Sequence, residues 1–324
     1  MTTSQMQQTL KPVDSVEIWT LQDNYIEITA MDNSAVVTRA TALKDGEIKA
    51  SVLAEHGFSA LVKTTAEGKS RTLLFDFGYS EDGAFRNAQT LGLDLTQIEE
   101  AALSHGHSDH TGAMAAFGAA LGKKNVPLVL HPAAFKSPRY LKFGEEIKVY
   151  FPELTREMIR RAGFEPVETQ TPYPMLDGTV LFLGDIPRRT DFEKGFPIAH
   201  RLEEGSEAPD PIEDDTSIVM NLQGKGLIIL SGCAHAGIIN TVQYALEVTG
   251  QSRVYAIMGG FHLSGPFFEH IIDRTADELQ KFDPVYVIPT HCTGRKAVME
   301  IEKKMPAQFI LNMAGTKLTF AKSG

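Results

Sequence analysis

The stretch SHGHSDHTG, Ser104 to Gly112, places three histidines and an aspartate within six residues. His105 and His107 directly follow EEAALS, which we expect to be a strand, and residues two apart on an extended chain project on the same side. The two imidazoles can therefore hold one cation. Asp109 and His110 follow, where the chain turns into a helix, and they can bind a second cation. Imidazole and carboxylate suit Zn, Mn or Fe, so the stretch predicts a site for two divalent transition-metal ions.

Further histidines follow three later predicted strands. His235 lies in SGCAHAG after GLIILSG, His262 in GGFHL after VYAIM, and His291 in PTHCTG after VYVI. A single histidine after a strand is more often structural, but loops at strand ends are where proteins of this type build their sites. We expect His235 and His291 to be metal ligands. His262 is either a ligand or a contact to the substrate.

The elements that must position these residues alternate between strand and helix patterns. Strand pairs dominate the N-terminal half, and strand, helix and strand alternate in the C-terminal half, which predicts a layered α/β fold. Residues 1–14 are polar and read as a flexible arm, and 15–324 as one domain. The segment 184–215 has no clear periodicity and is expected to be a long insertion loop, which would act as a lid or binding loop. The expected strands cover 59–65, 71–78, 99–104, 126–131, 179–184, 216–222, 226–232, 254–260, 284–292 and 316–321, and the expected helices 83–93, 112–122, 153–163, 238–250, 268–282 and 295–304.

HGHSDH resembles the HxHxDH signature of the metallo-β-lactamase superfamily. This resemblance implies a four-layer αββα sandwich with a binuclear metal site at one sheet edge. The upstream LLFDFG is similar to the first motif of the superfamily, so Asp76 is expected to support the ligands from behind. The resemblance implies two ligand sets, with Asp109 also the catalytic residue: His105, His107 and His235 for one ion, and Asp109, His110 and His291 for the other.

One part of the superfamily pattern is missing. A metal-bridging aspartate is expected at a late strand end, but Asp185 precedes His235, which reverses the usual order. Cys233 stands where the bridging aspartate or a cysteine is expected. It could therefore bind the metal directly or support the other ligands from behind. Cys233 and Cys292, the two cysteines of the chain, are either buried inert thiols or a redox pair, if their loops meet.

Four further motifs resemble those of one branch of the superfamily: GDIPR, SGCAHAGIIN, GGFHL and HCTG. This branch is similar to the archaeal dihydropterin synthases of the methanopterin pathway. Those enzymes join a dihydropterin diphosphate to a ribofuranosyl-aminobenzene phosphate. Three functions stay open. The first is a hydrolase that uses a metal-bound hydroxide on a small phosphoester, diphosphate or cyclic ester. The second is the C–N bond-forming transferase, and the third is a non-catalytic metal-binding or sensor protein.

Substrate contacts are expected from residues near these phrases. Arg188 and Arg189 can pair with a phosphate or carboxylate through their planar guanidinium groups, although they could equally be surface charges. Thr293 and His262 are assigned to the substrate as well, and His56 could face the site.

The amino-acid composition argues against some classes of binding partner. A formal net charge of −10 argues against nucleic acid, because phosphate binding needs a basic surface. No apolar run approaches the length of a membrane span, and the first residues have no apolar segment of a signal peptide. We expect a cytoplasmic protein with a small anionic substrate and no membrane partner. The sequence leaves open whether the protein forms a homo-oligomer.

Overall fold

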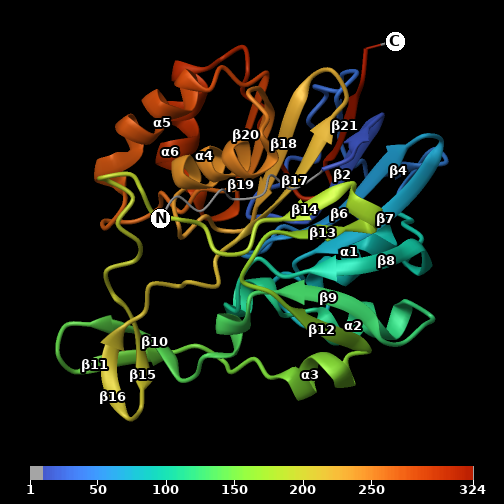
Figure 1. Cartoon of the computed structure of the whole chain (residues 1–324). Helices are drawn as coiled ribbons and strands as arrows, with labels where there is room; N and C mark the ends of the chain where they lie inside the picture. The colour runs from blue at the N-terminus through green and yellow to red at the C-terminus, as the bar shows by residue number, and fades with distance from the viewer. Residues whose placement is uncertain (1–9, 324) are drawn as a thin grey trace.

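Two large sheets lie face to face in the computed structural model, with helices on both outer surfaces (Figure 1). The structure describes residues 10–323. The first sheet has eight strands in the order β12-β9-β8-β7-β6-β2-β21-β3. Its strands are β2 (Ser15–Gln22), β3 (Val37–Thr38), β6 (Ser59–Ala66), β7 (Lys69–Phe75), β8 (Ile98–Ala102), β9 (Val126–Leu130), β12 (Phe164–Glu168) and β21 (Lys317–Ala321).

The second sheet has seven strands, in the order β13-β14-β17-β18-β19-β20 with β1 beside β17. Its β18, β19 and β20 run parallel to one another, so their carboxyl ends meet at one edge. The strands are β1 (Pro12–Val13), β13 (Tyr173–Met175), β14 (Val180–Phe182), β17 (Ser217–Leu222), β18 (Gly226–Ser231), β19 (Val254–Gly260) and β20 (Tyr286–Thr290).

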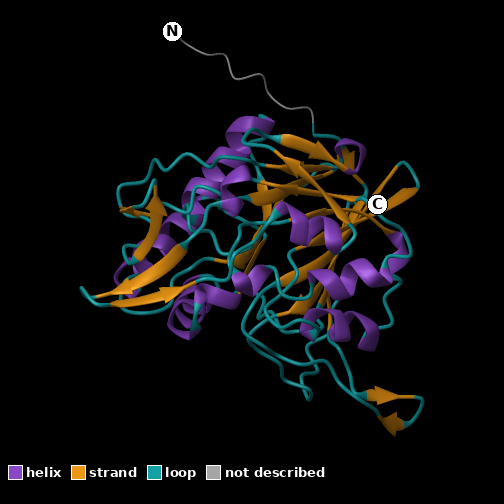
Figure 2. Ribbon diagram, turned by 90° about the horizontal axis from the view of Figure 1, so that it is seen from below, coloured by secondary structure: helices purple, strands orange, loops and turns teal. Residues whose placement is uncertain are grey.

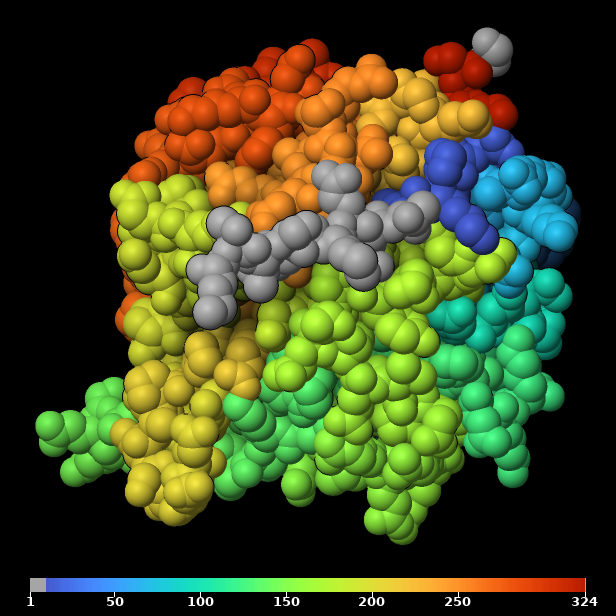
Figure 3. Space-filling model, viewed as in Figure 1, coloured from blue at the N-terminus to red at the C-terminus, as the bar shows by residue number. Residues whose placement is uncertain are grey.

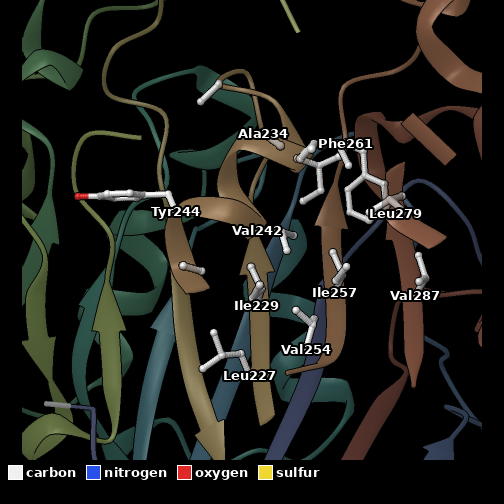
Figure 4. Close-up of a cluster of buried hydrophobic side chains, with 14 of the residues drawn as sticks. Leu227, Ile229, Ala234, Val242, Tyr244, Val254, Ile257, Phe261, Leu279 and Val287 are labelled. Carbon is white, nitrogen blue, oxygen red and sulfur yellow. The ribbon is translucent and has the colours of Figure 1, made fainter. Parts of the chain in front are cut away.

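Three apolar clusters fill the spaces between four layers. Alternate residues of β18 point to opposite faces, so Ile228 joins the cluster between the sheets while Ile229 packs under the C-terminal helices (Figure 4). Leu74 of β7 packs under the N-terminal helices in the third cluster. The predicted αββα sandwich is therefore confirmed. The helices are α1 (Gly83–Thr90), α2 (Met114–Ala120) and α3 (Arg156–Arg161) on the first sheet, and α4 (Ile238–Thr249), α5 (Ile272–Lys281) and α6 (Arg295–Lys304) on the second.

A third sheet of four strands, in the order β11-β10-β15-β16, projects from the sandwich. We call it the arm; it stands out at the lower left of Figure 3, and Figure 2 shows it on the side opposite the small hairpin of β4 (Leu43–Lys44) and β5 (Glu47–Ile48). Two of its strands lie in 184–215, so the expectation of a structureless loop there was wrong. The arm strands are β10 (Arg139–Phe143), β11 (Ile147–Tyr150), β15 (Ala199–Glu203) and β16 (Ser206–Pro209).

The expected flexible arm at 1–14 is only partly within the described residues, because 1–9 lie outside them. Pro12 and Val13 form β1 and pair with β17, and Val13 is fully buried. Residues 12 and 13 are thus part of the second sheet. Among residues 10–323, no helix is long and apolar enough to cross a membrane.

Candidate metal centre

The predicted site residues gather where the carboxyl ends of strands meet. Asp76 follows β7, the HGHSDH stretch follows β8, His235 follows β18, His262 follows β19 and His291 follows β20. Asp76, His262 and His291 have φ of 59°, 46° and 46°, in the left-handed region that non-glycine residues rarely adopt. Such backbone conformations are held against a local cost and tend to occur at functional sites.

The first group consists of His105, His107 and His235. Their side chains offer ligand atoms that all lie within 4.8 Å of one another. All three are buried, and the Nε2 of His105 lies 3.0 Å from the Nδ1 of His107. Within the described part of the chain, the Nε2 of His107 and both ring nitrogens of His235 have no hydrogen-bond partner. Unpaired buried nitrogens carry a desolvation cost, and a shared cation would remove it.

The protonation states of these three histidines also fit a cation site. Burial lowers the pKa of His107 to about 4. Burial also holds the pKa of His105 and of His235 well below the usual histidine range. The three rings are therefore neutral near pH 7, which is the protonation state that a metal ion requires of its histidine ligands.

The second group consists of Asp109, His110, His291 and Cys233, again with ligand atoms within 4.8 Å of one another. The Oδ2 of Asp109 lies 3.2 Å from the Nε2 of His291 and 3.8 Å from that of His110. The Sγ of Cys233 lies 3.1 Å from the Nε2 of His110. This set of carboxylate, imidazole and thiol fits a divalent transition metal.

The charges differ here from those of the first group. Burial acts to lower the pKa of His110, but the carboxylates of Asp109 and Asp76 outweigh it and raise that pKa to about 9. Burial acts to raise the pKa of Asp109, yet the charge of His110 and the imidazoles of His291 and His56, 3.2 and 3.3 Å from its Oδ2, hold that pKa well below its usual range. Without a cation, a proton on His110 balances the carboxylates.

Asp76 lies behind His110, where it was expected. Its Oδ2 is 2.7 Å from the Nδ1 of His110, and its two oxygens accept from the backbone N–H and the hydroxyl of Ser104, each at 2.7 Å. This arrangement fixes the imidazole so that Nε2 faces the second group. It is the usual way in which a carboxylate orients a ligating histidine.

A buried ion pair that the sequence did not point to supports the first group. Asp214 Oδ2 accepts a 2.8 Å hydrogen bond from the backbone N–H of Gly106, between the two ligand histidines. Arg139, at the root of the arm, donates to Asp214 Oδ1 at 2.6 Å and to Asp210 at 2.5 Å. A side chain at Gly106 would lie 2.6 Å from the carbonyl oxygen of Ala134, so this position has no room for one.

Three residues predicted to contact the substrate have protein partners in this structure. Arg188 donates to the backbone carbonyl of His235 at 2.7 Å and to that of Pro211, so its guanidinium holds the loop behind the site. Arg189 pairs with Glu247 on the outer surface of α4. Thr293 is fully buried, and its hydroxyl accepts from the N–H of Phe261 at 3.0 Å. Each of the three side chains thus has a structural contact in the described part of the chain.

His262 lies beside both groups. Its ring centroid is 4.1 Å from that of His235, and with Cys233 and His235 it forms a third set of potential ligand atoms. The loops of the two cysteines do meet, since the Sγ atoms of Cys233 and Cys292 are 3.3 Å apart and both thiols are free.

A cavity of about 470 Å³ opens onto these groups. His56, more than half exposed, stands at its polar side with Nε2 3.3 Å from Asp109 Oδ2. The signal for His56 was weak, because it precedes a strand, whereas the other candidate histidines follow one. Asn24 was not predicted at all, and its amide donates to the carbonyl of His291 at 3.2 Å.

Comparison with known proteins agrees with this fold. Residues 54–200 match the metallo-beta-lactamase superfamily. A 7,8-dihydropterin-6-methyl-4-(beta-D-ribofuranosyl)-aminobenzene-5'-phosphate synthase of Methanocaldococcus jannaschii is 30% identical over 274 residues, which are 82% of this chain and 90% of that protein.

Solved structures share the fold. Tm1679, a metal-dependent hydrolase of the beta-lactamase superfamily, superposes with a TM-score of 0.70 at 22% identity, covering 95% of this chain and 100% of that one. The metallo-beta-lactamase fold protein YhfI from Bacillus subtilis reaches a TM-score of 0.51 at 10% identity, with 95% and 100% covered.

An αββα sandwich with clustered histidines at one sheet edge defines a metallo-β-lactamase-type protein, and this chain belongs to the metallo-β-lactamase superfamily. Within the superfamily, it resembles the branch that contains the archaeal synthase, as the phrases GDIPR and SGCAHAGIIN predicted.

Proposed function

We propose that the chain is a hydrolase that depends on two divalent transition-metal ions and acts on a small phosphoester, diphosphate or cyclic ester. The observation that carries the proposal is the pair of adjacent ligand groups, one of three neutral imidazoles and one with a carboxylate and a thiol, at the floor of one cavity. We assign His105, His107 and His235 to one ion. Asp109, His110 and His291 hold the other, with Cys233 as a further ligand.

Two such cations would supply Lewis acidity and would lower the pKa of a bound water molecule. Asp109 is suited to orient that water and to carry its proton to the leaving group, because its carboxylate stays ionised and faces the cavity. Asp76 keeps His110 in the orientation that the second group needs. Apolar side chains around the cavity, among them Phe151 and Phe196, limit the access of other water molecules.

The substrate anion would rest on the metal ions themselves. None of the described residues that line the cavity is a lysine or an arginine. This distribution favours a substrate whose charged group is also its reacting group, such as a phosphoester. Zn, Mn and Fe all suit the donor set.

The second candidate is the C–N bond-forming transferase, which the 30% identity to the archaeal synthase favours. In that reaction the same groups would hold a diphosphate as it leaves, and an arylamine would take the place of water. A non-catalytic sensor is the third candidate.

One experiment separates the three. The protein loaded with Zn or Mn is given a phosphodiester, a phosphomonoester, a diphosphate and a lactone, and separately a dihydropterin diphosphate with and without an arylamine acceptor. We expect metal-dependent ester turnover that rises with pH as the bound water ionises. Diphosphate release that needs the acceptor, without ester turnover, would establish the transferase. If the metal-loaded protein turns over none of these compounds, the non-catalytic sensor is favoured.

A further inference from the structure

The arm presents two chemically different faces. The register pairs Leu141 with Val149 and Phe143 with Ile147, so these four side chains share one face. Lys142 and Lys148 lie on the other face, where Lys148 binds Glu207 at 2.8 Å. The charges of that second face thus have partners among themselves.

The apolar face is exposed. Phe143, Val149 and Ile147 keep 44%, 51% and 60% of their surface accessible. Leu141 and Phe143 also line the cavity above the metal-ligand groups, together with Phe151. The apolar face of the arm is therefore a continuation of the cavity wall toward the tip of the arm.

Phe151 connects this face to the metal centre. Its ring stacks on the imidazole of His107 with centroids 4.3 Å apart and planes 8° apart. Phe151 pairs with Arg139 at the root of the arm, and Ile147 pairs with Phe143 four residues further along the strand. At the usual rise of a strand, the apolar face is roughly 13 Å long from the metal centre outward.

We infer that the substrate is an amphiphile, with its reacting anionic group at the ligand cluster and an elongated apolar body along this face of the arm. The inference rests on the proposed function and specifies the substrate class. Its physical basis is burial: the exposed Phe143, Val149 and Ile147 gain stabilisation only when an apolar partner covers them. No described residue of the cavity wall is a lysine or an arginine, so the wall offers no partner to a second anionic group.

Binding of alkylphosphonic acids to the metal-loaded protein tests the inference without requiring turnover. Methyl-, butyl- and octylphosphonic acid carry the same anionic group, and calorimetry gives their Kd values. A fully buried methylene improves binding about fourfold. We expect a smaller gain, about twofold per methylene, because the face is open on one side. Octylphosphonic acid should then bind on the order of 100-fold more tightly than methylphosphonic acid.

The matched variants lie on one exposed strand. In Ile147→Ser/Val149→Ser the ratio between the methyl and octyl Kd values should fall at least tenfold. Tyr150→Ser alters the opposite face at a similar exposure, 55%, and should keep the wild-type ratio. Circular dichroism checks that both variants fold.

Each other result overturns the inference. Equal affinity for the three ligands in the wild type would mean that the arm does not hold the substrate. An equal loss in Tyr150→Ser would remove the distinction between the faces. A wild-type dimer that Ile147→Ser/Val149→Ser dissociates, with the chain-length gain unchanged, would identify the face as a contact between two copies. Failure of the proposed hydrolysis alone leaves the chain-length gain intact, so the two failures are distinguishable.

Discussion

Arg188 donates a 2.7 Å hydrogen bond to the backbone carbonyl of His235, so a residue expected to hold the substrate instead fixes the backbone of a proposed metal ligand. We predict that Arg188→Ala weakens the ion at His105, His107 and His235 by about 10- to 100-fold, the usual effect of losing a group that orients a ligand. Competition with a chelator measures this affinity. Arg189→Ala is the matched control, because its side chain pairs with Glu247 away from the site. Equal metal affinity in both variants would contradict the role of Arg188.

Asp76 should matter for the other ion. Its carboxylate meets the Nδ1 of His110 at 2.7 Å, and in Asp76→Asn an amide would replace the acceptor that fixes this ring. Asparagine tolerates the left-handed backbone at this position, where φ is 59°. We expect the affinity for one of two ions to fall about 10- to 100-fold while the other stays bound. If both ions are lost together, or neither is affected, Asp76 does not act through His110.

Metal loading should depend on pH in two different ways. The pKa of His110 is about 9 without metal, so below pH 9 a proton competes with the ion at Asp109, His110 and His291. The affinity of that site should fall about tenfold for each unit that the pH drops below 9. The pKa of His107 is about 4, so protons do not compete at that ring between pH 6 and 8.

Titration with limiting Zn or Mn and a weak chelator at pH 6 and at pH 8 checks this difference. We expect about one tightly held ion per chain at pH 6 and two at pH 8. Two ions with equal affinity at both values would show that His110 is not protonated in the metal-free protein.

Much of the site could be predicted from sequence because its ligands lie in short motifs after apolar strands. The stretch from His105 to His110 and the helix 295–304 required only local spacing. Arg139 and Asp214 could not be found this way, since 75 positions separate the two and each is an ordinary charged residue when considered alone. The arm consists of two local hairpins, β10 with β11 and β15 with β16, which were not predicted. The pairing of 139–141 with 199–201 joins them across distant segments, and local periodicity contains no record of such pairing.

Removal of the metals should lower stability. Ions that bind only the folded protein stabilise it by mass action, by about 2.7 kcal/mol when the free ion is at 100 times its Kd. For a chain of 324 residues, that corresponds to a fall in Tm of roughly 4 °C for each ion removed by the chelator. Added Zn or Mn should restore the original Tm. A Tm that responds to neither treatment would mean that the ligand groups are not loaded in the folded protein.

Metal content per chain tests the central claim most directly. Protein purified without chelator, analysed by inductively coupled plasma mass spectrometry, should carry close to two transition-metal ions. His107→Ala and His110→Ala should each lose one, because the two residues belong to different ligand groups. The double variant should lose both. Wild-type protein that holds no metal and cannot be reconstituted with Zn, Mn or Fe, or single variants with unchanged content, would contradict the two-ion centre.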